Sequence, residues 1–354
     1  MKTVLQLIPY DTVAGVETAA RTVPAQWGGD AGGAGIRFIR AYLVRKTPVQ
    51  VFPDDWHGPA VSENAPRAHW QLLRFAWATR PDLVVGSLWR VCPTLIILQW
   101  LRPRTPSVLF LHLARDVHRL DWLLNRLAMW RATEIWADSA ASLEARIPTR
   151  WRAKGRVLSF MTAPPDLIPR DDRPPEPQFV FWGRLQPQKD LPRALALFAA
   201  IHRQRPDARF TIFGPDRGEG DRLRALIAEL GLQEAVTLAG ALDHSALFAR
   251  ARDHSFYLQT SHEEGMAMSV IEAMSLGLLP VVTPVGEIAI YARDGENALH
   301  VTDDARAAAQ VLALLDDPAR YQAMRRAARD TWTGQALYRD DFIAACDRLL
   351  EGNT

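Results

Sequence analysis

The chain has 354 residues, of which 48% are hydrophobic and 23% charged. This length allows two domains of ordinary size, and the composition excludes a disordered or fibrous chain. Only two cysteines are present, which excludes a disulfide framework and a cysteine-based metal cluster and fits a reducing compartment. The longest apolar stretch, Cys92 to Leu101, is about half as long as a bilayer crossing requires. We therefore expect a cytoplasmic protein.

The charge is distributed unevenly along the chain. Residues 1–170 contain 22 Lys and Arg against 13 Asp and Glu, a balance of +9, whereas the remainder has 20 against 27, a balance of −7. The first part also holds ten of the twelve tryptophans. A basic, Trp-rich half is typical of a protein with an anionic partner such as a membrane surface or a lipid-linked phosphate. Core tryptophans and solvated arginines explain the same composition equally well. We expect no nucleic acid partner, because no nucleic-acid motif accompanies the basic residues.

Strand-like and helical stretches alternate along the chain, which is typical of α/β layering with parallel sheets. In the first half, the strands that we expect are Thr3–Ile8, Val49–Phe52, Leu83–Val85, Ser107–Leu111, Glu134–Ala137 and Arg156–Leu158. Amphipathic stretches between them, such as His69–Thr79 and Leu120–Met129, indicate helices. The Gly-rich run from Gly28 to Gly35 lacks the spacing of a dinucleotide-binding fingerprint, and we interpret it as a flexible cleft loop.

A proline-rich, charged stretch, Ala163 to Gln178, can continue neither a helix nor a central strand, so it is the best linker candidate. Beyond it the α/β pattern restarts, with expected strands at Phe179–Trp182, Arg209–Phe213, Ala235–Leu238, Ser255–Gln259 and Leu279–Val282. Two doubly wound domains in series place a ligand in the cleft between them, at the carboxyl ends of the strands. The last stretch, Asp340 to Leu350, indicates a helix that packs on either domain.

One stretch combines a strand end, a glycine turn and a helix start. Residues 261–285 read SHEEGMAMSVIEAMSLGLLPVVTPV, and Gly265 lets the backbone turn before a helix that begins near Ala267. The N–H groups of Gly265, Met266, Ala267 and Met268 then form an anion site at a helix N-terminus. Glu264 is expected at the mouth of that site, and Glu272 lies about two helical turns deeper. A carboxylate near bound phosphate requires hydroxyls or a cation, so sugar or ribose hydroxyls are its natural partners.

The pair Glu264 and Glu272, with EG after a strand and EAMSLGLLPVV beyond it, resembles the signature of retaining glycosyltransferases of family 4, which have the GT-B fold. The resemblance implies that Glu264 lies by the donor sugar and the leaving diphosphate. It implies that Glu272 binds the ribose, and that the amides between the two hold sugar and phosphate. The segment 285–301, VGEIAIYARDGENALHV, resembles the stretch that follows in the family, and we expect it to close the sheet and support the site.

A second segment carries the same resemblance. Residues 179–190 read FVFWGRLQPQKD, a strand that ends in Gly183-Arg184 and is followed by Lys189. Arg and Lys at a strand end can neutralise a diphosphate. The family has GR followed by Lys here, with both cations on the diphosphate, which implies that role for Arg184 and Lys189. The family usually has Gly after that Lys, whereas this chain has Asp190.

Two candidates come from the first half. Gly15 follows the first strand, where the family has a Gly-rich turn close to donor phosphate and acceptor, although one glycine of the usual pair is Ala14 here. His112 ends an expected strand at a place where many relatives carry a cleft His. It would hold a sugar hydroxyl or act on the acceptor near neutral pH. A single His at a strand end is as often structural, and both interpretations stay open.

We therefore expect an α/β protein with the GT-B fold, in which two Rossmann-like, doubly wound domains face each other across a cleft. The acceptor-binding domain is expected at 1–168 and the nucleotide-sugar donor domain at 175–335. A helix at about 336–354 packs back on the first domain or lies on the second. We expect no cofactor and no metal, because the chain has no Asp-x-Asp and its nine His form no i,i+4 pair with a third ligand.

The resemblance implies transfer of a sugar, with retention, from a nucleotide diphosphate sugar to a glycan or lipid-linked acceptor in bacterial polysaccharide or glycoconjugate assembly. A GT-B sugar-nucleotide epimerase and a catalytically silent sugar-nucleotide-binding protein stay open as alternatives. A nicotinamide-dependent dehydrogenase is disfavoured because the glycine fingerprint is missing. A peripheral contact with the inner membrane face also stays open. The segment 89–104, WRVCPTLIILQWLRPR, fits such a contact, but an ordinary core helix is the better interpretation of so short a run.

Overall fold

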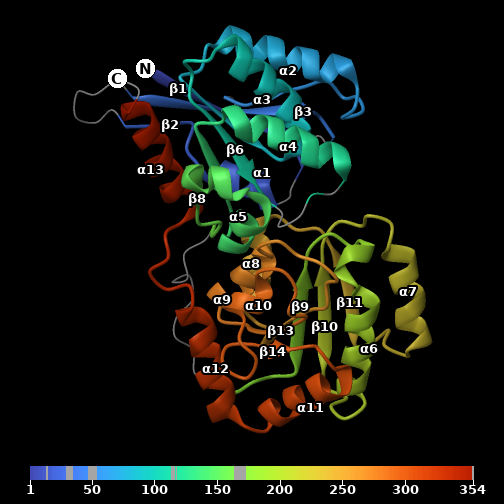
Figure 1. Ribbon diagram of the computed structural model, residues 1–354. Coiled ribbons are helices and arrows are strands. Elements are labelled where there is room, and N and C mark those ends of the chain that lie inside the picture. Colours follow the sequence, from blue (N-terminus) through green and yellow to red (C-terminus); the bar gives the residue numbers. More distant parts are fainter. Residues whose placement is uncertain are drawn as a thin grey trace. The chain divides into compact units, whose positions relative to one another are not determined.

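A computed structural model describes residues 1–12, 15–28, 35–46, 54–112, 116, 118–162 and 173–352. The chain divides into two compact units (Figure 1). Unit 1 comprises Met1–Thr162 together with Ala336–Thr354, and unit 2 comprises Ala163–Gln335. No helix in the described part of the chain is long and apolar enough to cross a membrane.

Unit 1 is built on a sheet with the strand order β2-β3-β1-β5-β6-β7-β8, to which β4 adds by pairing with β3. The strands are β1 (Lys2–Tyr10), β2 (Gln26–Trp27), β3 (Ile36–Val44), β4 (Trp56–His57), β5 (Leu83–Ser87), β6 (Ser107–Leu111), β7 (Glu134–Ala137) and β8 (Gly155–Val157). All pairings are parallel except that of β2 with β3. The central strands are buried along their whole length, as expected for a parallel sheet covered on both faces.

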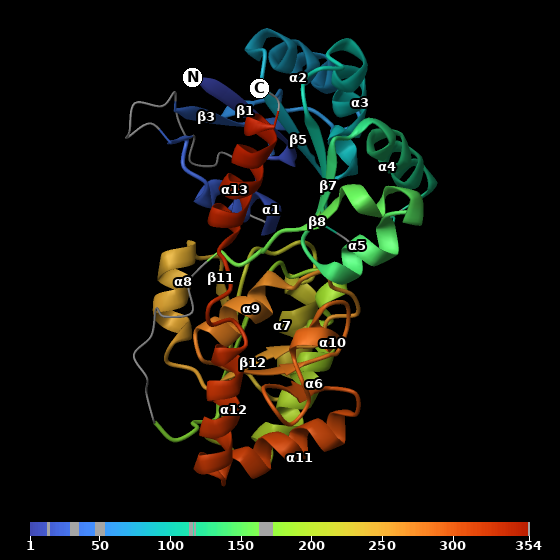
Figure 2. The same cartoon turned by 60° about the vertical axis from the view of Figure 1, so that its left-hand side comes forward.

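The helices of unit 1 form a layer on each face of this sheet (Figure 2). They are α1 (Gly15–Thr22), α2 (Pro66–Thr79), α3 (Cys92–Leu101), α4 (Arg119–Arg131), α5 (Ala140–Arg146) and α13 (Tyr338–Glu351), with 3-10 turns η1 (Trp89–Val91) and η2 (Thr149–Lys154). On one face α3 packs between α2 and α4. On the other, Phe342 of α13 packs edge-on against Phe38 and Trp136 of the sheet. The last helix therefore belongs to unit 1.

Unit 2 has a second parallel sheet with the strand order β11-β10-β9-β12-β13-β14. The strands are β9 (Gln178–Trp182), β10 (Arg209–Phe213), β11 (Val236–Gly240), β12 (Phe256–Gln259), β13 (Leu279–Val282) and β14 (Leu299–His300). Within the unit this is the order 3-2-1-4-5-6 of a doubly wound sheet, whose direction of winding reverses between β9 and β12. The carboxyl ends of those two strands are where such sheets bind ligands.

Helices cover both faces of the second sheet. They are α6 (Leu191–His202), α7 (Gly220–Glu229), α8 (His244–Ala251), α9 (Met268–Ser275), α10 (Ile288–Tyr291), α11 (Asp304–Leu315) and α12 (Pro318–Asp330), with the 3-10 turn η3 (Pro187–Lys189). α6 packs against α7 and α11, whereas α12 packs against α9 and β13. The stretch 285–301 ends in the edge strand β14, so it closes this sheet as expected.

Most of the expected strands are present within a residue or two, but β3 was not anticipated from the sequence. Its run IRFIRAYLV contains Arg37 and Arg40, which hide the apolar pattern. Arg40 is nonetheless buried, and its guanidinium forms an ion pair of 2.6 Å with Asp55 and also donates to the backbone carbonyls of Ala20 and Val23. These partners satisfy the charge inside the sheet. The expected strand at 49–52, most of the Gly28–Gly35 loop and most of the linker lie outside the described residues.

Candidate functional site

The candidate site of unit 2 lies at the carboxyl ends of β9 and β12. β9 ends at Trp182 and leads through Gly183 and Arg184 into the turn that carries Lys189. β12 ends at Gln259 and leads into the loop 260–267 that precedes α9. Hydrogen bonds join the two loops: the amide N–H of His262 donates to the Gln188 carbonyl at 2.9 Å, and the Thr260 hydroxyl donates to the Asp190 carbonyl at 2.7 Å. The fold thus brings together two segments separated by about seventy residues.

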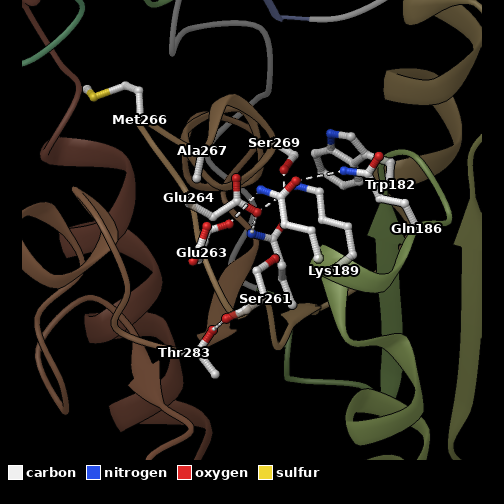
Figure 3. A network of polar contacts seen from close by, with 12 residues as sticks. Trp182, Gln186, Lys189, Ser261, Glu263, Glu264, Met266, Ala267, Ser269 and Thr283 are labelled. Atoms are coloured by element: carbon white, nitrogen blue, oxygen red, sulfur yellow. Dashed lines mark hydrogen bonds and ion pairs between the residues drawn. The ribbon is translucent and has the colours of Figure 1, made fainter. Parts of the chain in front are cut away.

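An ion pair forms the centre of this site. Nζ of Lys189 lies 2.6 Å from Oε1 of Glu264, and both side chains are about nine-tenths buried. The same carboxylate oxygen accepts a hydrogen bond of 3.2 Å from Nε2 of Gln259. Figure 3 shows the Lys189 and Glu264 side chains pointing toward one another, with Met266 standing away from the network. The chain therefore holds the Glu264 carboxylate in one place with two donors.

The amide of Gln259 is itself held by two hydroxyl groups. Its Oε1 lies 2.7 Å from the Tyr257 hydroxyl and 3.0 Å from the Ser269 hydroxyl. Burial raises the pKa of Tyr257 well above 10, so the hydroxyl keeps its proton and can donate. With both hydroxyls bonded to Oε1, the NH₂ group of Gln259 is directed at Glu264. This arrangement fixes the orientation of Gln259 and, through it, that of the carboxylate.

The start of α9 exposes backbone donors. The helix begins at Met268, and Ala267 takes its N-cap position in a left-handed conformation with φ 53°. Alanine offers no side-chain oxygen to cap the helix. In the described part of the chain, the N–H groups of Gly265, Met266 and Ala267 donate no hydrogen bond. Unpaired N–H groups at a helix N-terminus form a site for an anion.

The neighbouring segment after β13 supports this loop from behind. The Glu287 amide donates to the Gly265 carbonyl at 3.2 Å, and the Tyr291 hydroxyl donates to the Met266 carbonyl at 3.0 Å. Gly286 has a φ of +57°, and a Cβ there would lie 2.1 Å from the Glu264 carbonyl oxygen. Only glycine fits this contact. The stretch 285–301 therefore supports the site as well as closing the sheet.

Glu272 lies on the inner side of α9 and is paired on both of its oxygens. The indole N–H of Trp182 donates to Oε2 at 2.9 Å, and Nε2 of His244 lies 2.9 Å from Oε1. Burial lowers the pKa of His244, but the hydrogen bond and the charge of Glu272, with the charge of Asp243, outweigh it and raise the pKa above 6.5. Each carboxylate oxygen keeps a further lone pair for a ligand hydroxyl. Glu272 and Glu264 thus lie in separate hydrogen-bonding environments.

The remaining candidates are placed differently. Arg184 is exposed after β9 and has no hydrogen bond or ion pair with another described residue, which leaves its guanidinium available to a ligand. Gly15 begins α1 in unit 1. His112 follows β6 in unit 1, where its ring lies 4.2 Å from that of Phe110, and neither ring nitrogen has a hydrogen-bond partner among the described residues. The structure therefore groups the unit 2 candidates and leaves the roles of Gly15 and His112 as predictions.

The surroundings of His112 determine the charge of its imidazole. Burial lowers its pKa to about 3, so the imidazole is neutral throughout the physiological range. A group with this pKa stays uncharged near neutral pH, and Oδ2 of Asp138 lies 3.9 Å from its Nδ1. The action of His112 on the acceptor stays a prediction. A neutral imidazole can still hold a sugar hydroxyl.

Several residues of the site were missed in the sequence. Trp182 and Gln259 are the last residues of the strands that precede the two site loops, so their position could have indicated that they belong to the site. His244 reaches Glu272 from a helix 28 residues earlier, and no local sequence pattern indicates this contact.

Among the described residues, no group of three or more His, Cys, Asp and Glu side chains is arranged to hold a metal ion.

Comparison with known proteins points to one fold family. Residues 169–331 match the model of the family described as glycosyl transferases group 1. The chain is 35% identical over 158 residues to a D-inositol 3-phosphate glycosyltransferase of Acidothermus cellulolyticus. This match covers 42% of the chain and 35% of the relative. It is 32% identical over 184 residues to a GDP-mannose:cellobiosyl-diphosphopolyprenol alpha-mannosyltransferase of Xanthomonas campestris, covering 49% of the chain and 48% of the relative.

Solved structures resemble the whole chain. The structure of Anabaena Alr3699/HepE in complex with UDP and glucose superposes with a TM-score of 0.77 at 15% identity, over 98% of this chain and 100% of that one. Sucrose-phosphate synthase from Thermosynechococcus elongatus superposes with a TM-score of 0.75 at 16% identity, over the full length of both chains. At this identity the superpositions show a shared fold. The fold is that of the GT-B enzymes, although the chain spans only about a third to a half of the length of the curated relatives it matches.

Proposed function

We propose that this chain is a retaining glycosyltransferase of family 4 that transfers a hexosyl group from a nucleotide diphosphate sugar without a metal ion. The observation that carries the proposal is the Lys189–Glu264 ion pair beside the unpaired N–H groups at the start of α9. A cation and helix-end amides at a switch point suit a diphosphate, and the adjoining carboxylate suits a sugar hydroxyl.

Each residue of the site has a role in this proposal. Lys189 and Arg184 bind the diphosphate together with the amides of Gly265, Met266 and Ala267. Glu264 orients the donor sugar, and Glu272 accepts hydrogen bonds from the ribose hydroxyls. Several similar proteins support a nucleotide donor by their names: one is described in complex with UDP and glucose, and another uses GDP-mannose. The identities of the base and of the sugar stay open.

In the proposed reaction the acceptor hydroxyl attacks the anomeric carbon on the face from which the diphosphate departs. The bond from that carbon to the phosphate oxygen breaks, and the departing phosphate oxygen takes the proton of the acceptor hydroxyl. Lys189, Arg184 and the amides stabilise the negative charge that develops on the leaving group. No strong protein base is needed on this path, so Glu264 is not assigned as a nucleophile.

A glycan or lipid-linked acceptor completes the proposal. One similar protein takes its sugar to a cellobiosyl-diphosphopolyprenol, which is a lipid-linked glycan. We assign the same class of acceptor to this chain, within bacterial polysaccharide or glycoconjugate assembly at the cytoplasmic face of a membrane. Gly15 and His112 of unit 1 would then contact the acceptor side of the reaction, with the neutral imidazole holding a hydroxyl.

The test is a panel of UDP-, GDP- and ADP-sugars, incubated with and without glycan and diphospholipid-linked acceptors, with release of nucleoside diphosphate as the readout. Acceptor-dependent release supports the proposal. An epimerised sugar produced without acceptor indicates an epimerase, and donor binding without turnover indicates a silent binding protein. Glu272→Ala should weaken donor binding at least tenfold, on the order of the loss of two hydrogen bonds. Unchanged affinity would remove the ribose role.

A further inference from the structure

The outer side of the helix layer α2–α3–α4 in unit 1 carries apolar side chains where solvent-facing polar ones are expected. Of the thirteen large hydrophobic residues that are exposed in the described part of the chain, ten lie on these three helices. They are Trp70, Trp77, Ile97, Trp100, Leu101, Leu120, Trp122, Leu123, Leu127 and Trp130. A surface helix of a globular protein normally turns its polar face outward, and clustered exposed apolar residues mark a contact site. We refer to these ten residues as the tryptophan patch.

The patch is continuous from helix to helix. On α4 the residues Leu120, Leu123, Leu127 and Trp130 recur at helical spacing, so they form one exposed stripe. Trp130 meets Trp100 of α3 with ring centroids 6.1 Å apart. Because α3 packs between α2 and α4, the three helices present one layer to solvent (Figure 2).

Arginines lie among these apolar residues and carry the charge of the surface. The three helices and the turn after α3 contain Arg67, Arg74, Arg102, Arg104, Arg119, Arg126 and Arg131. Three guanidinium groups lie over exposed indoles: Arg102 over Trp77 at 4.5 Å, Arg131 over Trp100 at 4.6 Å and Arg126 over Trp122 at 5.7 Å. The sole acidic residue of the three helices is Asp121, which is buried.

A hollow at the edge of the patch adds polar groups. It has a volume of about 290 Å³ and is lined by Gln99, Thr105, Trp130 and Arg131, among others. A guanidinium and a hydroxyl around a hollow of this size suit a small polar head group.

We propose that the tryptophan patch binds the surface of an anionic lipid membrane. Tryptophan places an apolar ring and an N–H donor at the boundary between acyl chains and head groups, and leucine and isoleucine enter the acyl region. The arginines match the negative head groups. A symmetric contact between two copies would instead bring these arginines against one another. A contact with the RNA or DNA backbone would leave the exposed leucines without an apolar partner.

Vesicle flotation of the full chain tests this surface without donor or acceptor, so the result does not depend on the proposed transfer reaction. Vesicles of phosphatidylglycerol mixed with phosphatidylcholine should bind the protein at least about tenfold more strongly than phosphatidylcholine alone, and raised salt should weaken the binding. Lipids brominated near the head group should quench tryptophan fluorescence, because five tryptophans belong to the patch. Absence of binding to the anionic vesicles would overturn the proposal.

Two pairs of variants locate the contact. Leu123→Ser with Leu127→Ser should reduce vesicle binding several-fold, whereas Val157→Ser with Ile290→Ser, at exposed apolar sites outside the patch, should not. Arg67→Gln with Arg74→Gln should reduce the preference for anionic lipid, with Arg222→Gln and Arg224→Gln on α7 as the control. Circular dichroism and the melting temperature show that each variant is folded. Equal binding by patch and control variants would overturn the assignment, as would a dimer that dissociates only in the patch variants.

Discussion

The Lys189 ammonium group lies 2.6 Å from the Glu264 carboxylate, and both groups sit where the two halves of the second sheet wind in opposite directions. A buried ion pair contributes little net stability to a fold, because desolvation of the two charges offsets their attraction. Its position beside unpaired backbone N–H groups gives it another use, since an arriving diphosphate can take Lys189 as a partner. Under the proposed function, the pair keeps the cation in place until the donor binds.

Replacing Lys189 tests this use. Lys189→Met should weaken donor binding by about 10- to 100-fold, because one charge-assisted hydrogen bond contributes about 1.5–3 kcal/mol. Among the described residues the Glu264 carboxylate then keeps Gln259 as its one partner, so the melting temperature should also fall. Isothermal titration with the nucleotide diphosphate measures the affinity. Lys189→Arg, which keeps the charge, is the control, and equal nucleotide affinity in the Met variant would exclude a diphosphate contact.

The indole of Trp182 positions Glu272, and its loss should appear in KM rather than in kcat. Trp182→Phe removes the N–H that donates to Oε2 at 2.9 Å while keeping the ring packed against Tyr257. A several-fold increase in the KM for the donor is expected, on the order of 1 kcal/mol. The matched control is Trp332→Phe, because that indole donates to the sulfur of Met274 on the same helix and not to the Glu272 carboxylate. A similar loss in both variants would indicate a packing effect instead.

Most of the candidate site in unit 2 could be predicted from the sequence because its residues lie within two short loops. Strand ends such as Trp182-Gly183 and Gln259 are defined by local apolar runs, and the doubly wound pattern brings neighbouring strand ends together. The pairing of Lys189 with Glu264 spans 75 residues and follows only from the strand order. The contact of His244 with Glu272 could not be predicted from the sequence, because it depends on where α8 packs. Strand β3 was not predicted because Arg40 interrupts its apolar pattern, and the sequence does not show that Asp55 pairs with this buried charge.

Asp190 follows Lys189 at the position where the family that the sequence resembles usually has glycine. It adopts φ 44° and ψ 47°, a left-handed conformation that is unfavourable for residues with a Cβ, although Asp tolerates it better than most. Asp190→Gly should raise the free energy of unfolding by about 0.5–1 kcal/mol and tighten donor binding by removing a carboxylate near the diphosphate. Chemical denaturation and titration measure the two effects.

The two effects of Asp190 can be separated by a second variant. Asp190→Asn removes the charge but keeps a residue that accepts the left-handed conformation. It should reproduce the gain in donor affinity without the gain in stability. If Asp190→Asn binds the donor no better than the unaltered chain, the acid does not oppose the diphosphate.

Gly286 is the residue on which the shape of the Glu264 loop depends most directly. A Cβ at this position would lie 2.1 Å from the Glu264 carbonyl oxygen, so Gly286→Ala must displace the loop as well as strain a φ of +57°. We expect at least a tenfold loss of donor affinity and a destabilisation of about 1–3 kcal/mol. Gly295→Ala is the control, because its φ of +74° imposes the same strain while its Cβ meets open space. Equal affinity in the two variants would show that the loop absorbs the contact.

The depressed pKa of His112 makes unit 1 sensitive to acid. Burial lowers this pKa from 6.5 to about 3. Between these two pH values the imidazole is protonated in the unfolded chain and neutral in the folded chain. The unfolded state then binds more protons, and the free energy of unfolding falls as the pH drops from 6.5 toward 3, by up to about 1.4 kcal/mol per pH unit. Urea denaturation of the His112→Gln variant should show a shallower loss over this range. His254→Gln in unit 2 serves as the comparison, since burial lowers that pKa as well. A slope in the His112 variant identical to that of the unaltered chain would mean that the imidazole takes up its proton at the same pH in the folded and unfolded chains.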